Sequence, residues 1–409
     1  MKNKQFTFTL VLLSLLLVLG ISSHALGETY KIGLSLAITG PTSDVGVPYS
    51  KGVEDYCKYV NDEKLLGDDK LECFIRDDGY KTEVTKRNLE DFLDENIVFY
   101  LNYSTGSTLA LRPDFEEEKI PVLPASFHIG NLVDSNYIFL PISSYSSQAV
   151  GLAEYVVANH EGSGKPKVAM FLHPSAFGRA SRDDVEKAIA AGLGIDLVEV
   201  VEHGKDLDNT AMLKRFQSKG VQYVISHTVQ PPVATMLKGA QSLGMAASKY
   251  GEAGKITFLG AHYSGGPDLI GLAGSAAEGF IWTTSYKIMT AKGPGTDAQF
   301  ALAKRYGRDE SVANSQNYTN GIMVVQVAVE TMRRAKAKGK KVTRASLYDE
   351  LLTMNGYNAF YPLTTVGPVT FSKTDREGVD TLQLYVVKGG VFHEQGLPFA
   401  SEYMKKMQQ

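Results

Sequence analysis

The sequence has 409 residues, of which 44% are hydrophobic and 21% are charged. This composition predicts a globular protein with large apolar cores, and at roughly 150 residues per domain the length corresponds to about two or three domains. The 42 basic and 45 acidic side chains give a net charge of −3, which argues against the strongly basic surface of a nucleic-acid-binding protein. Two cysteines are too few for a disulfide-rich scaffold or a cysteine-based zinc or iron–sulfur site.

The N-terminal segment has the pattern of an export signal. A short basic start precedes an apolar run over residues 10–19. That run has the length of a signal-peptide core and is well short of the roughly 20 residues that a membrane span needs. Small residues follow it, so we expect cleavage after Gly27, with the bond after Ala25 as the alternative. No later stretch is apolar for long enough to predict a membrane span.

Strand and helix patterns alternate from Tyr30 onward. Short apolar runs predict strands, and apolar residues spaced by three and four predict helices. The predicted strands of the first part are 32–37, 71–75, 97–101 and 120–123. The predicted helices between them are 48–60, 83–93 and 107–118, the last interrupted near Pro113. This alternation is typical of a parallel sheet with helices on both faces.

A second alternating series follows a serine-rich stretch at residues 143–147, which we interpret as a hinge strand. Its predicted strands are 167–172, 197–201, 221–226, 256–259 and 279–283. Its predicted helices are 148–159, 183–191, 210–219 and 233–243. Further helices are predicted at 297–306, 318–336 and 342–354, and strand-like segments at 367–371 and 381–387. The sequence therefore predicts two α/β lobes.

The two cysteines are placed where they can meet. Cys57 shares a predicted helix face with Val53 and Val60, and Cys73 shares a strand face with Leu71. A helix and the strand after it pack face to face in a βαβ unit. In an exported protein we predict a structural Cys57–Cys73 disulfide, and the alternative is two buried free thiols.

Several short motifs, none of them specific alone, occur in an order typical of one family. They are Gly40-Pro41, Asp77-Asp78, Ser104-Thr105-Gly106-Ser107, the Ile-Pro-Val-Leu-Pro-Ala-Ser segment at 120–126, and Phe177-Gly178. With the export signal, they make the chain resemble the type I periplasmic solute-binding proteins of ABC importers, in the branched-chain amino-acid (leucine/isoleucine/valine-binding-like) group. The resemblance extends from about residue 30 to the C-terminus.

The resemblance implies a Venus-flytrap fold: α/β, with two doubly wound parallel-sheet lobes joined by three crossing strands. After a signal peptide at 1–27, lobe 1 would comprise 28–143 and 284–378. Lobe 2 would comprise 144–283, and 379–409 would hold a crossing strand and the C-terminal part of lobe 2.

The resemblance also implies a function. A monomeric periplasmic protein would bind a small carboxylate-bearing solute in the cleft, close its lobes on it, and deliver it to an inner-membrane ABC permease complex. The alternative is a sensory receptor of the same fold, coupled to a membrane kinase or chemoreceptor. We expect no enzymatic activity, no cofactor, no metal site and no nucleic-acid partner.

Candidate site residues follow from positions that match the family. In amino-acid-binding relatives, hydroxyls of two loops hold the solute carboxylate, and Ser104, Thr105 and Ser126 match those loops. For Ser104 the alternative is a helix cap. Val45 and Tyr318 match positions where relatives place an aromatic residue facing the cleft, and for Tyr318 the alternative is core packing.

Other matching positions depart from the family pattern. Phe127 stands where relatives have Thr, Phe177 where they have Tyr, and Val229 or Gln230 where they offer Tyr. His262 stands where amino-acid readers often have an acid. A neutral histidine offers an ammonium group only one acceptor. We therefore expect deaminated or aromatic acids to compete with leucine, isoleucine and valine.

One of three other acids could supply the missing negative charge instead. They are Asp44, Asp268 and Glu278.

Overall fold

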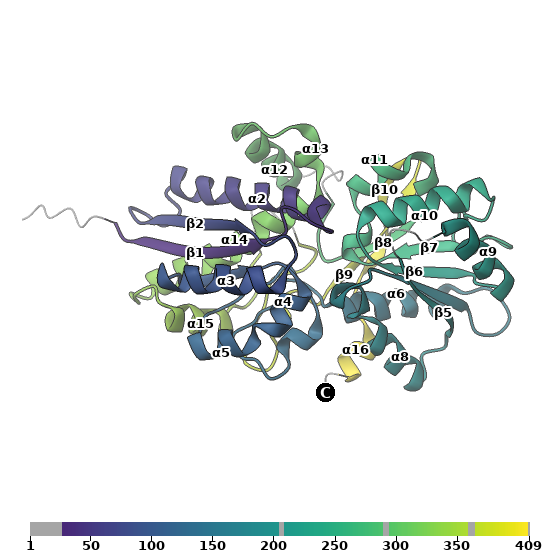
Figure 1. Ribbon diagram of the computed structural model, residues 1–409, viewed down its shortest axis with the longest axis horizontal. Helices are drawn as coiled ribbons and strands as arrows, with labels where there is room; N and C mark the ends of the chain where they lie inside the picture. Colours follow the sequence, from purple (N-terminus) through teal and green to yellow (C-terminus); the bar gives the residue numbers. More distant parts are fainter. Residues whose placement is uncertain (1–26, 204–207, 289–293, 359–364, 408–409) are drawn as a thin grey trace, which may run out of the picture.

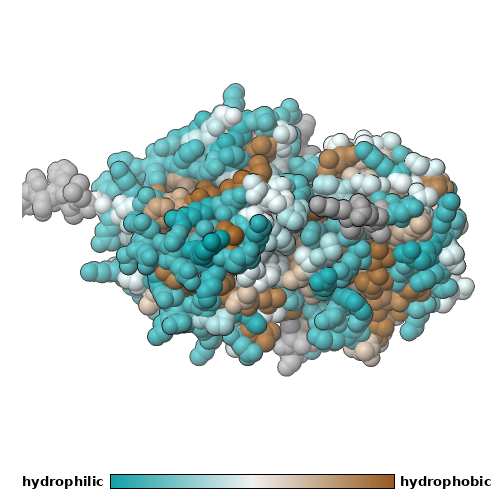
Figure 2. Space-filling model, viewed as in Figure 1, coloured by the Kyte–Doolittle hydropathy of each residue, from teal (hydrophilic) through white to brown (hydrophobic). Residues whose placement is uncertain are grey.

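The computed structural model describes residues 27–203, 208–288, 294–358 and 365–407. Figure 1 shows two α/β lobes side by side. Hydrophilic residues cover most of the first lobe on the face shown in Figure 2, and the second lobe shows a mixture of hydrophilic and apolar areas. Apart from Gly27, the predicted signal segment lies outside the described residues. Among the helices of the described ranges, none is both long enough and apolar enough to cross a membrane.

The first lobe is built on a parallel sheet in the order β2-β1-β3. Its strands are β1 (Thr29–Leu36), β2 (Lys70–Asp77) and β3 (Phe99–Asn102). Isolated parallel bridges of Val122 with Tyr100 and Ile138 extend this sheet, so the strand predicted at 120–123 is reduced to bridges at one residue. The helices of this lobe are α2 (Ser43–Asp62), α3 (Thr82–Asp94), α4 (Thr105–Ala110), α5 (Arg112–Glu118), α12 (Pro294–Arg305), α13 (Glu310–Asn314), α14 (Gln316–Ala337) and α15 (Arg344–Leu352).

Helices α2 and α14 come from distant parts of the sequence and pack backbone against backbone (Figure 1). A Cβ atom on Gly52 would lie 2.1 Å from the carbonyl oxygen of Tyr318, and a Cβ atom on Gly321 would lie 2.1 Å from the carbonyl oxygen of Tyr49. No side chain fits at either position, so the two glycines allow the close approach of the helices.

Two links fix α2 within lobe 1. The predicted disulfide is confirmed: Cys57 of α2 is bonded to Cys73 of β2. On the same helix, the fully buried Asp55 carboxylate accepts hydrogen bonds from Arg308 at 2.9 and 2.7 Å and from the hydroxyl of Tyr318 at 2.8 Å.

The second lobe holds a seven-stranded sheet in the order β10-β9-β8-β7-β6-β4-β5, in which β9 is antiparallel to both neighbours. Its strands are β4 (Lys167–Leu172), β5 (Asp196–Glu202), β6 (Tyr223–His227), β7 (Thr257–Gly260), β8 (Ile281–Thr284), β9 (Leu382–Lys388) and β10 (Val391–Phe399). Its helices are α6 (Tyr145–Asn159), α7 (Ala176–Arg179), α8 (Arg182–Ala190), α9 (Asn209–Lys219), α10 (Gln230–Ser242), α11 (Pro267–Ala273) and α16 (Glu402–Met407). The edge strand β10 was not predicted, because it is mostly exposed and lacks a run of apolar residues.

Three chain segments cross between the lobes, and serine side chains connect them. The hydroxyl of Ser143 donates to the carbonyl oxygen of Val379 at 2.6 Å, and the hydroxyl of Ser285 donates to that of Ser143 at 2.9 Å. Where the structure describes them, these segments form isolated bridges, including those of Leu140 with Glu377 and of Tyr286 with Thr365. The serine-rich stretch is therefore not a regular strand. Its hydroxyls connect the crossing segments.

Candidate functional site

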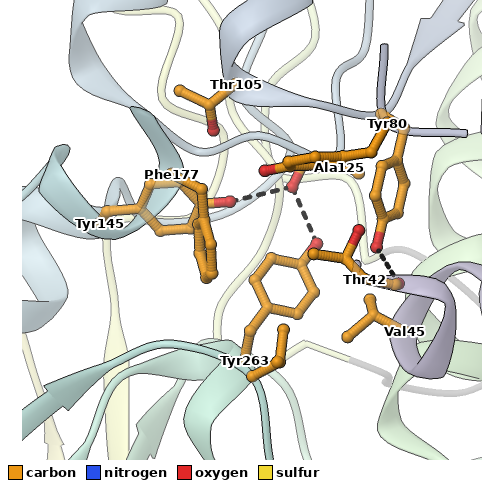
Figure 3. Close-up of a pocket in the computed structure, with 10 residues that line it drawn as sticks. Thr42, Val45, Tyr80, Thr105, Ala125, Tyr145, Phe177 and Tyr263 are labelled. Carbon is orange, nitrogen blue, oxygen red and sulfur yellow. Dashed lines mark hydrogen bonds between the residues drawn. The ribbon is translucent and has the colours of Figure 1, made fainter. Parts of the chain in front are cut away.

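A small cavity lies between the two lobes (Figure 3). The two lobes approach each other closely here, so the cavity volume is only about 20 Å³. Ten residues line it: Thr42, Val45, Tyr80, Tyr103, Thr105, Ala125, Tyr145, Phe177, Val229 and Tyr263.

The strand order explains why these residues meet. Thr42 and Tyr80 follow the carboxyl ends of β1 and β2, and Thr105 begins α4 just after β3. In lobe 2, Val229 follows β6 and Tyr263 follows β7. The cavity therefore lies at the carboxyl ends of parallel strands from both sheets, where open α/β folds bind their ligands.

The carbonyl oxygen of Ala125 is a polar centre of the cavity (Figure 3). It accepts a hydrogen bond from the hydroxyl of Tyr263 at 2.8 Å and a second from the hydroxyl of Tyr145 at 3.2 Å. The ring of Phe177 packs edge-on against both tyrosine rings, at centroid distances of 5.3 Å from Tyr145 and 5.8 Å from Tyr263. Aromatic rings and hydroxyls thus form most of the wall.

A hydroxyl pair lies on the lobe 1 side. The oxygens of Thr105 and Ser126 are 2.7 Å apart. The side-chain amide of Asn131 donates to the Ser126 hydroxyl at 3.1 Å and to the Ser126 carbonyl oxygen at 3.0 Å. Either hydroxyl of the pair can be the donor, because Ser126 keeps a second lone pair after it accepts from Asn131.

The structure places other predicted residues beside the cavity rather than in its wall. The Ser104 hydroxyl accepts from the backbone N–H of Ser107 at 3.1 Å and so caps α4. Phe127 stacks on Tyr263 with a centroid distance of 5.7 Å and an interplanar angle of 5°. The amide of Gln230 donates to a backbone carbonyl at 3.0 Å, while its neighbour Val229 lines the cavity.

His262 differs most from expectation. Its Nε2 lies 2.9 Å from the side-chain amide nitrogen of Asn320 and its Nδ1 lies 2.7 Å from the Thr284 hydroxyl oxygen. The amide nitrogen donates, so Nε2 accepts and Nδ1–H donates. Burial lowers the pKa of His262 to about 3, so the ring is neutral. Both ring nitrogens form hydrogen bonds within the protein. The presence of His262 therefore does not indicate which charge a solute carries.

Tyr318 also faces away from the cavity, because its hydroxyl is bonded to the buried Asp55. Of the three acids considered as counter-charges, Asp44 and Asp268 line a separate depression, and Asp268 accepts a hydrogen bond from Ser315 at 3.0 Å. Glu278 accepts from the backbone of the β9–β10 turn. None of the three is among the residues lining the cavity in the described part of the chain.

Sequence reasoning missed six lining residues, namely Thr42, Tyr80, Tyr103, Ala125, Tyr145 and Tyr263. Two of them are direct neighbours of predicted residues, since Ala125 precedes Ser126 and Tyr263 follows His262. The four tyrosines could not be singled out in the sequence, because tyrosine side chains also pack in protein cores.

Comparison with known proteins agrees with this architecture. The sequence profile of the family described as "Periplasmic binding protein" matches residues 29–391. The leucine-specific-binding protein of Salmonella typhimurium is 22% identical over 380 residues, which cover 89% of this chain and 93% of that protein. The leucine-, isoleucine-, valine-, threonine-, and alanine-binding protein of Pseudomonas aeruginosa is 22% identical over 65% of this chain and 69% of that protein.

Among solved structures, a branched-chain amino acid ABC transporter protein from Thermus thermophilus with bound valine is 44% identical. It matches with a TM-score of 0.86 over 93% of this chain and 99% of that one. A solute-binding protein from R. palustris in complex with 4-hydroxybenzoate has a TM-score of 0.75, covers 93% of this chain and 100% of that one, and is 17% identical, which shows a common fold. Given the profile match and the two-lobe architecture, the chain belongs to the periplasmic binding protein family.

Proposed function

We propose that the chain is the substrate-binding subunit of an ABC importer, exported to the periplasm with cleavage near Gly27, where it acts as a monomer. It binds a small carboxylate-bearing solute and presents it to an inner-membrane permease complex. The observation that carries the proposal is that both lobes line one cavity. A solute that contacts both walls binds the closed arrangement better than an open one, and that difference drives closure.

The carboxylate end of the solute is assigned to the Thr105 and Ser126 hydroxyl pair. Thr105 lines the cavity, and its hydroxyl hydrogen can be donated to a solute when Ser126 donates to Thr105. Hydrogen bonds to a carboxylate are stronger than those between neutral groups, so the Thr105 hydroxyl is a suitable anchor.

The leading solute class is a branched-chain amino acid such as valine, which the 44% identical Thermus protein carries. The hydroxyl oxygens of Tyr145 and Tyr263 donate to Ala125 and keep lone pairs that can accept from an ammonium group. The faces of Tyr145 and Tyr263 add a second source of attraction, since a cation near an aromatic ring is stabilised by the ring quadrupole.

A second class, the deaminated or aromatic acids, is favoured by one observation. None of the ten residues that line the cavity in the described chain is an acid. Burying an ammonium group without a counter-charge costs several kcal/mol. The R. palustris protein, which shares the fold, binds 4-hydroxybenzoate.

Titration calorimetry with valine, leucine, the 2-oxo acid of valine, benzoate and 4-hydroxybenzoate tests the proposal. Tight binding of valine without heat from its 2-oxo acid would establish the amino-acid class, and the reverse would establish the second class. Binding of none of these acids, checked by a thermal-shift screen of further carboxylates, would overturn the proposed function. Permease and ATPase genes beside this gene would support import over sensing.

A further inference from the structure

One polar atom of the cavity wall has no partner within the described chain. The side-chain oxygen of Thr42 is buried, forms no hydrogen bond, and belongs to a residue only 2% exposed that lines the cavity. In Figure 3 the Thr42 side chain lies between Tyr263 and Val45, on the opposite side of the cavity from Thr105. Buried hydroxyls are normally hydrogen-bonded, so this one needs an explanation.

The fold itself does not use this hydroxyl. Thr42 is the N-cap residue of α2, a position where threonine usually accepts a hydrogen bond from the helix backbone. Here the Thr42 side chain makes no such bond, and the backbone N–H of Val45 donates to the Thr42 carbonyl oxygen at 3.1 Å instead. The carbonyl oxygen of Thr42 accepts from the Tyr103 hydroxyl at 3.1 Å, which helps to hold this residue in the wall.

The chemistry of the wall limits what the Thr42 hydroxyl can bind. A hydroxyl both donates and accepts, so it can pair with a hydroxyl or a carbonyl group. No charged side chain is among the ten lining residues of the described chain, so a second ionic group here would be left uncompensated. The partner that fits is an uncharged hydrogen-bonding group.

We propose that Thr42 is a specificity-determining residue that binds an uncharged hydroxyl or carbonyl group at the end of the solute remote from its carboxylate. This inference rests on the proposed function, because it takes the carboxylate to lie at Thr105, across the cavity in Figure 3. The site therefore prefers a hydroxylated solute over the matching apolar one.

Matched pairs of acids that differ in one hydroxyl test the proposal. Threonine and valine are nearly isosteric, and 4-hydroxybenzoate differs from benzoate only by its hydroxyl. Each acid identified by the calorimetric panel is also paired with its hydroxylated counterpart. Affinities are measured for the unaltered protein, for Thr42→Val, which keeps the shape without the hydroxyl, and for Thr42→Ser, which keeps the hydroxyl.

We expect the hydroxylated member of at least one pair to bind about fivefold or more tightly to the unaltered protein, the size of one net hydrogen bond. Thr42→Val should abolish this ratio and Thr42→Ser should retain it. Thermal unfolding of each variant without solute checks that the fold is intact. Equal affinities within every pair, or the same ratio in Thr42→Val, would overturn the assignment of Thr42 and leave the proposed function standing. Failure of the unaltered protein to bind any acid would instead overturn the proposed function.

Discussion

The hydroxyl of Tyr263, in lobe 2, donates a hydrogen bond of 2.8 Å to the carbonyl oxygen of Ala125, in lobe 1. This bond connects the lobes directly through the cavity wall. Tyr263→Phe should therefore weaken the closed arrangement and lower solute affinity by about two- to tenfold, the range of one net hydrogen bond. Calorimetry with the best solute measures the effect.

Tyr250→Phe is the matched control for Tyr263→Phe. The Tyr250 hydroxyl also donates to a backbone carbonyl oxygen, that of Val156 at 3.3 Å, and both residues belong to lobe 2. Its removal should cost some stability without changing solute affinity. Equal affinity losses in the two variants would show that the bond between Tyr263 and Ala125 has no special part in closure.

Thr105 and its neighbour Ser104 should respond differently to substitution. Thr105→Val removes the hydroxyl assigned to the solute carboxylate and should weaken binding about tenfold or more, since hydrogen bonds to charged groups are worth roughly 1.5–3 kcal/mol. Ser104→Ala removes the cap of α4 and should cost about 1 kcal/mol of unfolding free energy with a smaller effect on affinity. Calorimetry and urea unfolding of both variants measure these effects. A larger affinity loss in Ser104→Ala would reverse the assignment.

Arg308 is the positively charged partner of the buried Asp55 carboxylate. Arg308→Met should lower the unfolding free energy by about 3–5 kcal/mol, because it leaves a buried charge without its partner. Tyr318→Phe removes one hydrogen bond to the same carboxylate and should cost about 1 kcal/mol. Both variants should keep the solute affinity of the folded protein. If Tyr318→Phe lowered the solute affinity without lowering the stability, Tyr318 would have to be assigned to the binding site.

Lowering the pH should destabilise the folded protein, in part because His262 is buried in its neutral form. Burial lowers the pKa of His262 to about 3, against 6.5 for a free histidine. Between these values the unfolded chain binds the proton and the folded chain does not. The contribution of His262 to the free energy of unfolding is therefore fully present above pH 6.5. It is lost as the pH falls below that value, at up to about 1.4 kcal/mol per pH unit. Burial lowers the pKa of His227 to about 3 as well, so it acts in the same direction.

Urea unfolding at pH 7.5, 6.5 and 5.5 measures this dependence. His262→Asn removes the titrating group, so the variant should lose less stability on acidification than the unaltered protein does. Identical pH slopes in the two proteins would show that His262 does not titrate on unfolding.

The Cys57–Cys73 disulfide closes a loop with a sequence separation of 16 residues. In the chain-entropy account, such a loop stabilises the folded state by about 3 kcal/mol. The Cys57→Ser, Cys73→Ser double variant should therefore unfold at a lower urea concentration. Non-reducing mass spectrometry of the exported protein should find no alkylatable thiol, and finding two would contradict the disulfide.

The disulfide and the order of strands and helices followed from periodicity, because burial on one face leaves a repeating pattern in the sequence. The cavity wall did not follow as well. Sequence comparison located the loops, but the structure turns Tyr263 rather than His262 to the cavity, and Val229 rather than Gln230. Which of two adjacent loop residues faces the cavity depends on backbone angles that no periodic pattern encodes.

The partners of His262 could not be predicted for a different reason. Asn320 lies 58 residues further along the chain on α14, and Thr284 lies at the end of β8. The contact with Asn320 depends on how the two lobes come together, and the contact with Thr284 depends on the pairing of β7 with β8; local patterns describe neither. The exposed strand β10 escaped prediction because a strand with one mostly solvated face and a bulge lacks the apolar run that marks buried strands.

The contact of α2 with α14 at Gly52 and Gly321 affects how random mutagenesis of this protein should be interpreted. Even an alanine at residue 52 would bring its Cβ to 2.1 Å from a backbone oxygen of the facing helix, so the helices would have to separate. The first turn of α2 carries Val45, with Thr42 just before it, and both line the cavity. A screen for lost solute uptake would therefore recover changes at Gly52 that touch no solute. Such hits would report a displaced cavity wall, and should not be counted as contact residues.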